Sequence, residues 1–225
     1  MTPSAGAREN NSLSRELRGF GPAGIAALLV ILLLGPPWFR AILVLIWARL
    51  SRTSWRDLGF VRPGNWGITV MPGLFSGIIL KFLLKAVVMP LISADPINRA
   101  YHYLAGNTAA IPAMVLIIIV SAGFGEETVF RGFLFERSGK LFGHSRTAMI
   151  GIVLLTSVLF AAAHYPDQGI FAVEQAFFTG LFFGSVFAIT ANLWLVIVAH
   201  AAFDLTALAM IYYDVEWQIA HWIFK

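Results

Sequence analysis

Long apolar stretches separated by short polar segments make up most of the chain after its first twenty residues. They lack the alternation of apolar and polar positions that membrane β-strands require. Most approach or exceed the roughly 20 residues with which a helix crosses a bilayer. The pattern predicts an all-α polytopic integral membrane protein. Its expected apolar helices are Gly21–Leu50, Trp66–Ile92, Ala109–Lys140, Ser145–His164, Ile170–Thr190 and Asn192–Tyr213.

The stretch Gly21–Leu50 allows two interpretations, because Pro36-Pro37 interrupts it. It forms either a hairpin of two short spans or one kinked span, and crossing twice brings the total to about seven transmembrane helices. A basic region precedes this apolar core, as in a signal peptide. No small-x-small cleavage site follows it, so we expect an uncleaved anchor.

Basic residues predict the orientation. They cluster in the N-terminal tail, in the loop Ser51–Asn65 and in the connection around residues 137–146, whereas the loops Ser93–Thr108 and Tyr165–Gly169 contain only Arg99. Basic loops stay in the cytoplasm. We therefore expect an integral membrane protein with a cytoplasmic N-terminus. We expect Tyr165–Gly169 to be a tight loop.

The composition agrees with a membrane protein and excludes several functions. Hydrophobic residues make up 58% of the chain, charged residues 12%, and the mean hydropathy is +0.77. A soluble domain of this size could not cover so much apolar surface. The absence of cysteine excludes disulfides and thiol catalysis. The net charge of +4 lies at the borders of apolar runs, so we expect no nucleic-acid partner.

Three short motifs place ionisable side chains in or against apolar helices. A charged group there costs about 2.5–3.5 kcal/mol on insertion scales, so a functional role is its default explanation. The motifs are Glu126-Glu127-x-x-x-Arg131, Phe160-x-x-x-His164 and His200-x-x-x-Asp204.

The first motif separates two glutamates by role. Glu127 and Arg131 are four residues apart with the acid first, which favours an ion pair on a helix. Glu126 then points roughly 100° away and has no built-in partner. A desolvated, unpaired carboxylate is a candidate general base. The alternative is that Glu126 ends a helix at the membrane interface. Gly123-x-Gly125 beside it leaves room for backbone or substrate.

The other two motifs place histidines beside helical neighbours. Phe160 can pack against His164 and orient it, and Asp204 can hold the tautomer of His200 one turn away. The alternative is that these residues are polar pairs that join helices. We count the depth of each motif residue from the expected cytoplasmic end of its helix, at about 1.5 Å per residue. The depths differ by some 15 Å. Their convergence is therefore a hypothesis.

In this order on successive membrane helices, the motifs resemble the CPBP (Abi) family. This family comprises type II CAAX prenyl proteases and membrane proteins of bacteriocin processing or immunity. The similarity covers residues 109–213. It leaves 1–20 as a polar cytoplasmic tail, 21–108 as N-terminal transmembrane helices and loops, and 214–225 as a short C-terminal tail.

The resemblance implies a glutamic-type intramembrane endopeptidase that acts on a peptide or protein substrate, including lipidated or membrane-associated ones. It implies that Glu126 and His164 activate the hydrolytic water, and that His200 and Asp204 surround the carbonyl oxygen. Family members with asparagine at the last position can donate an amide proton there. With Asp204 in this chain, we expect His200 to donate and Asp204 to orient it.

The same resemblance implies supporting roles for Glu127, Arg131 and Phe160 and no cofactor. Two alternatives stay open. Two histidines and two carboxylates are acceptable zinc ligands, so Glu126, His164, His200 and Asp204 could instead bind zinc, although no His-Glu-x-x-His pattern is present. The fold could also serve a non-enzymatic immunity or transport function, because proton relays use the same residue types.

Four more charged residues lie in or beside the expected apolar helices. Lys81 and Lys85 either line a wet helix face or extend outward to the interface. Glu174 is a second candidate site residue within an apolar helix. Arg40 is expected to anchor at the interface beside Trp38.

The glycine pairs Gly73-x-x-x-Gly77 and Gly180-x-x-x-Gly184 have the spacing with which membrane helices approach closely. We expect them to serve packing.

Overall fold

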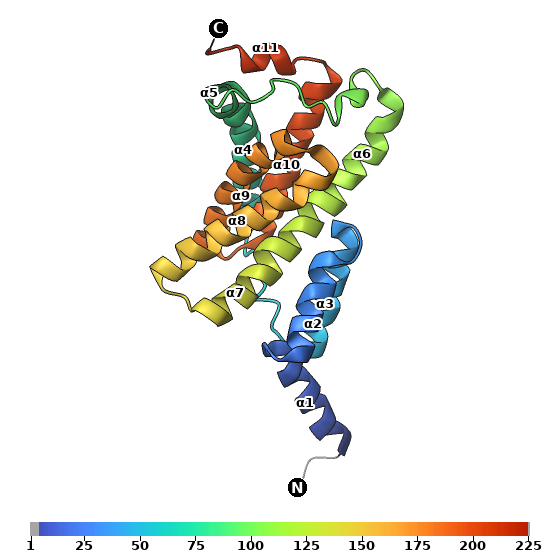
Figure 1. Ribbon diagram of the computed structural model, residues 1–225, viewed down its shortest axis with the longest axis vertical. Helices are drawn as coiled ribbons and strands as arrows, with labels where there is room; N and C mark the ends of the chain where they lie inside the picture. The colour runs from blue at the N-terminus through green and yellow to red at the C-terminus, as the bar shows by residue number, and fades with distance from the viewer. Residues whose placement is uncertain (1–4, 225) are drawn as a thin grey trace.

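The computed structural model describes residues 5–224 of the chain, and all regular elements in this range are helical. The all-α class is confirmed. Figure 1 shows an elongated bundle with α1 projecting at one end and the C-terminal helix at the other. The elements are α1 (Ala5–Arg18), α2 (Pro22–Leu33), α3 (Pro37–Ser51), α4 (Trp66–Leu83), η1 (Leu84–Val88), α5 (Met89–Leu91), η2 (His102–Leu104), η3 (Thr108–Ala110), α6 (Ile111–Ile117), η4 (Ile118–Glu126), η5 (Thr128–Leu134), α7 (Phe135–Phe142), α8 (Arg146–Gln168), α9 (Ile170–Thr190), α10 (Leu193–Tyr212) and α11 (Glu216–Ala220).

Within the described residues, five helical segments are long and apolar enough to cross a membrane. They are 66–91, 108–142, 146–168, 172–190 and 193–212. A sixth follows if Ser12–Arg18 and Pro22–Leu33, which are bent by 59°, count as one. The protein is an integral membrane protein. This count of five or six is below the expected count of about seven, because α2 has 12 residues and α3 has 15, fewer than the roughly 20 of a full span.

The segments α2 and α3 form a hairpin and lie side by side in Figure 1. The turn between them uses Gly35 at φ +78°, a conformation that favours glycine. The hairpin ends against Gly125, where an added Cβ would lie 2.8 Å from the carbonyl carbon of Pro37. The backbone of α3 therefore reaches the residue that precedes Glu126.

The main helix pairs are α4 with α10 and α8 with α9, and glycines lie at both contacts. An added Cβ on Gly77 would lie 2.1 Å from the carbonyl oxygen of Ala199 on α10. One on Gly180 would lie 3.0 Å from the Cα of Ser157 on α8. The predicted packing role of both glycine pairs is confirmed.

Replacing Gly77 by alanine should destabilise the protein. The added methyl group would meet backbone, which cannot rotate away, so α4 and α10 must separate. Overpacking of this kind costs about 1–3 kcal/mol. The measurement is unfolding in detergent by denaturant titration.

The control is Gly151→Ala on α8, where an added Cβ meets nothing within 4 Å. It should leave stability unchanged or raise it by up to about 1 kcal/mol, because alanine is the better helix former. Equal effects of the two substitutions would contradict the close contact.

The predicted loop Tyr165–Gly169 is wrong. Helix α8 continues through Pro166 to Gln168, and only Gly169, at φ +72°, leaves the helix. The backbone N–H of Gly169 donates to the Tyr165 carbonyl at 2.9 Å. A proline in the last turn removes one helical hydrogen bond, and the turn survives that loss. The sequence Pro-Asp-Gln-Gly alone resembles a turn.

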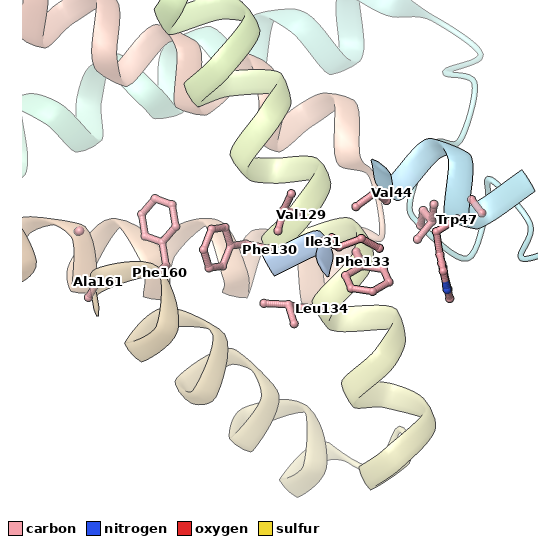
Figure 2. Packing of buried hydrophobic residues seen from close by; sticks show 12 residues of the cluster. Ile31, Val44, Trp47, Val129, Phe130, Phe133, Leu134, Phe160 and Ala161 are labelled. Carbon is pink, nitrogen blue, oxygen red and sulfur yellow. The ribbon is translucent and has the colours of Figure 1, made fainter. Parts of the chain in front are cut away.

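A buried cluster holds the helix that carries the first motif (Figure 2). Val129, Phe130 and Phe133 of η5 pack between the hairpin and α8. The Trp47 ring meets Phe133 edge-on at 4.8 Å, and the Phe130 ring meets Phe160 at 5.0 Å. This packing fixes η4 and η5 relative to α8.

Candidate active site

The three motifs lie on three separate helical segments and meet at one cavity of about 480 Å³. Its lining includes Glu126 from η4, His164 from α8, and His200 and Asp204 from α10. All four predicted catalytic residues are thus brought together. Their helices are inclined to one another in Figure 1, with α8 running obliquely across the bundle.

Glu126 faces both histidines across the cavity. Its Oε2 lies 4.0 Å from His164 Nε2 and 3.9 Å from His200 Nε2. Its side chain is only 15% exposed, and Oε2 has no hydrogen-bond partner among the described residues. The two glutamates lie at the junction of the π-helical segments η4 and η5, a wide helical form that recurs at functional sites. Glu126 therefore offers an unused carboxylate oxygen inside the cavity.

The backbone sets the tautomer of His164. Its Nδ1 donates to the Phe160 carbonyl at 2.8 Å, so in the neutral ring Nε2 is the acceptor. This Nε2 faces Glu126. The Phe160 ring packs against the imidazole with a centroid distance of 4.6 Å, as the spacing of the motif predicts.

His200 is oriented by Glu127. Its Nδ1 lies 2.6 Å from Glu127 Oε1, and Nε2 lies 3.4 Å from Asp204 Oδ2. Asp204 lies within ion-pair distance of His200, and Glu127, which the sequence did not suggest as a partner of this ring, makes the shorter contact. Glu127 holds the nitrogen that points away from the cavity, and Asp204 faces the nitrogen that points into it.

The predicted ion pair of Glu127 with Arg131 is present, at 2.8 Å between Oε1 and the guanidinium. Both side chains are fully enclosed, with 0% and 1% exposure. Arg131 also donates to the Gly180 carbonyl at 3.2 Å. Its guanidinium lies 4.6 Å from the Phe160 ring and 5.7 Å from the Phe183 ring.

Sequence reasoning missed two members of this arrangement, both on α9. Phe183 stacks on His200 with a centroid distance of 5.0 Å and an interplanar angle of 27°. Gly180 supplies a backbone carbonyl to Arg131. Phe183 is one of 19 phenylalanines, and a backbone carbonyl has no sequence signature, so the pattern Gly180-x-x-x-Gly184 indicated packing alone.

The loop before α6 contributes Asn98 and Tyr101 to the cavity lining. Burial raises the pKa of the Tyr101 phenol, and the nearby acids Asp204 and Glu126 add to the effect. Tyr101 consequently stays protonated at neutral pH. Its hydroxyl accepts a hydrogen bond from Gln168 at 3.4 Å.

The structure also places the remaining charged residues. Lys81 and Lys85 are both buried, so neither extends to the interface. Lys85 pairs with Glu216 at 2.7 Å. Arg40 lines the cavity and donates through Nε to the Gly35 carbonyl at 2.7 Å. Glu174 is not part of the cavity lining.

The cavity contains the residue types of a zinc site, two histidines and two carboxylates. Across the residues that the structure describes, no three His, Asp or Glu side chains are arranged to hold a metal ion. Catalytic zinc requires three protein ligands at about 2.0–2.2 Å from the metal. The four acidic and imidazole groups of the cavity thus lack a preformed coordination geometry.

Comparison with known proteins agrees with the motifs. Residues 108–206 match the family described as type II CAAX prenyl endopeptidase Rce1-like. The matched segment contains all three motifs, so the family resemblance of this part of the chain is confirmed. No match was found among curated proteins or among solved structures.

Proposed function

From the Rce1-like identity of residues 108–206, we propose that this protein is an intramembrane endopeptidase that hydrolyses peptide bonds with water activated by Glu126 and His164. The family match supports a membrane endopeptidase. The main structural support is the unpaired Glu126 Oε2, which faces two imidazole nitrogens at about the same distance in one cavity.

In the proposed reaction, a water molecule lies between Glu126 and His164. A separation of 4.0 Å is too long for a direct hydrogen bond and suits a bridging water. Glu126 takes one proton from this water, and the second O–H of the water donates a hydrogen bond to His164 Nε2. The resulting hydroxide attacks the carbonyl carbon, and Glu126 then returns the proton to the leaving nitrogen as the C–N bond breaks.

His200 is the proposed donor to the carbonyl oxygen. Protonated on both nitrogens, it gives Nδ1–H to Glu127 and directs Nε2–H into the cavity. In the resting enzyme Asp204 faces this hydrogen, and in the reaction the developing oxyanion replaces it. Glu127, Arg131 and Phe160 hold the two imidazoles in position.

We propose that the substrate is a membrane-associated peptide or protein. Both CAAX-type processing of lipidated proteins and leader-peptide processing fit this proposal. The cavity lining includes the apolar residues Met114, Ile117 and Ile118, and this surface suits a lipidated or hydrophobic segment. We also propose the bacterial inner membrane, from the resemblance to bacterial members of the family, and a cytoplasmic N-terminus, from the distribution of basic residues.

The test uses purified protein in detergent and an S-farnesylated peptide that ends in a CAAX sequence. We expect cleavage, detected as a shorter product by mass spectrometry, and no loss of activity with 1,10-phenanthroline. An unprenylated peptide of the same sequence measures the contribution of the lipid.

Stoichiometric zinc together with inactivation by the chelator would favour the zinc mechanism. A protein that cleaves neither peptide and gives substrate-dependent current in liposomes would overturn the assignment as an enzyme.

A further inference from the structure

Lys81 is a buried cation that the proposed mechanism does not use. It lies on α4 in the first of the five membrane-crossing segments and is 3% exposed. Its Nζ donates to Gln175 Oε1 at 3.0 Å and lies 5.0 Å from the Phe203 ring centroid. Among the described residues no carboxylate lies within ion-pair distance of this Nζ, whereas Lys85 has Glu216. The Lys81 ammonium, which is costly to insert into a membrane, therefore has the neutral side-chain amide of Gln175 as its hydrogen-bond acceptor.

That amide belongs to a residue of the cavity wall. Gln175 lies on α9 and lines the cavity together with Phe203 and Asp204. Because its Oε1 accepts from Lys81, its Nε2 must point elsewhere. In the described part of the chain this Nε2 makes no hydrogen bond to protein. Gln175 therefore presents a free N–H donor at the cavity wall.

The position of Gln175 along α9 relates it to the catalytic groups. Gln175, Thr179 and Phe183 are spaced by four residues, so they share a helix face. The first two line the cavity, and Phe183 stacks on His200. Eight residues of helix span about 12 Å. An extended peptide covers this distance in about three to four residues.

We propose that Gln175 binds the substrate by donating Nε2–H to a main-chain oxygen three to four residues from the scissile bond. Lys81 is the positioning residue that turns the amide toward the cavity. The acceptor is either an internal carbonyl or the terminal carboxylate of a short C-terminal segment. This inference rests on the proposed endopeptidase function. It adds a binding contact at a defined distance from the cleavage site.

The test compares Gln175→Glu with the wild type on the farnesylated CAAX peptide. Glutamate keeps the length of the side chain and the bond from Lys81, but it replaces the donor by an acceptor. We expect KM to rise about tenfold and kcat to change by less than about threefold, as for the loss of one hydrogen bond. Lys81→Met should raise KM by about threefold, because the amide loses its orientation.

A binding measurement separates this inference from the proposed function. In the Glu126→Gln background, fluorescence anisotropy of the labelled peptide should show weaker binding when Gln175→Glu is added. A penalty that shrinks with a C-terminally amidated peptide assigns the acceptor as the terminal carboxylate, and an unchanged penalty assigns it as an internal carbonyl.

The control is Gln218→Glu, the same chemical change at an exposed position of α11. It should leave KM and binding unchanged. Wild-type KM and binding in Gln175→Glu would overturn the inference while leaving the proteolytic function intact. A wild type that binds the peptide without cleaving it would instead count against the proposed function, and absence of binding would overturn both.

Discussion

Glu126→Gln is expected to reduce peptide hydrolysis by about 10²–10⁴-fold, the usual contribution of a positioned general base. Glutamine has the shape of glutamate but cannot take the proton of water. Glu126 Oε2 has no hydrogen bond within the described residues, so the substitution removes no structural contact there. The measurement is kcat with the farnesylated peptide, together with the thermal unfolding temperature in detergent.

Glu174→Gln is the matched control. Glu174 is also a glutamate in a membrane-crossing helix, and its Oε2 is likewise buried without a hydrogen bond, but it is not part of the cavity lining. Its substitution should leave kcat within about threefold of the wild type, as expected for a group outside the reaction. A folded Glu126→Gln protein with wild-type kcat would exclude Glu126 as the base.

The sequence was sufficient to predict the fold class and the convergence of Glu126, His164, His200 and Asp204 at one cavity. Charged residues in apolar helices are costly enough to be noticed, and the spacing of four residues revealed both the Glu127–Arg131 pair and the contact of Phe160 with His164. Convergence was less certain, because counting at a fixed rise left a spread of some 15 Å in depth. Inclined helices and π-helical turns remove this spread, and neither is visible in a residue pattern.

The orientation of His200 depends on a second contact that local spacing does not reveal. Asp204 is its helical neighbour, so sequence spacing favoured that pair. In the structure Glu127 lies on another helical segment and contacts His200 Nδ1. The same carboxylate oxygen also accepts from Arg131. A contact between residues 73 positions apart depends on helix packing, and one sequence does not reveal it.

The N-terminal hairpin was predicted only as one of two possibilities. The pair Pro36-Pro37 indicates that the helix is interrupted, but it does not indicate how far each half extends into the membrane. Gly125 allows the hairpin to pack at this position, because the absence of a side chain there lets Pro37 of α3 reach the helix of Glu126. The hairpin consequently contributes Arg40 to the cavity, although it lies outside the segment that matches the family.

Breaking the buried pair of Glu127 and Arg131 should produce the largest loss of stability. Arg131→Met leaves the Glu127 carboxylate without its cation, and it also removes the bond to the Gly180 carbonyl. Removing one partner of a buried ion pair costs about 3–5 kcal/mol. We expect a corresponding fall in the free energy of unfolding, measured by denaturant titration in detergent.

The double variant Glu127→Gln/Arg131→Met distinguishes a lost pair from lost packing. With both charges removed, the penalty should be smaller than the sum of the two single substitutions by about 0.5–3 kcal/mol, the range for residues in direct contact. Asp95 and Arg99 provide the matched control, because they form the same i,i+4 acid–arginine pair with Arg99 78% exposed. Arg99→Met should change stability by less than about 1 kcal/mol.

A cost for Arg131→Met no larger than that for Arg99→Met would mean that water reaches the Glu127 carboxylate. The enclosed site in which Glu127 holds His200 would then be absent. Activity provides a second readout, since His200 depends on the same carboxylate oxygen as Arg131. The surviving folded fraction of Arg131→Met should therefore show a lower kcat, whereas folded Arg99→Met should not.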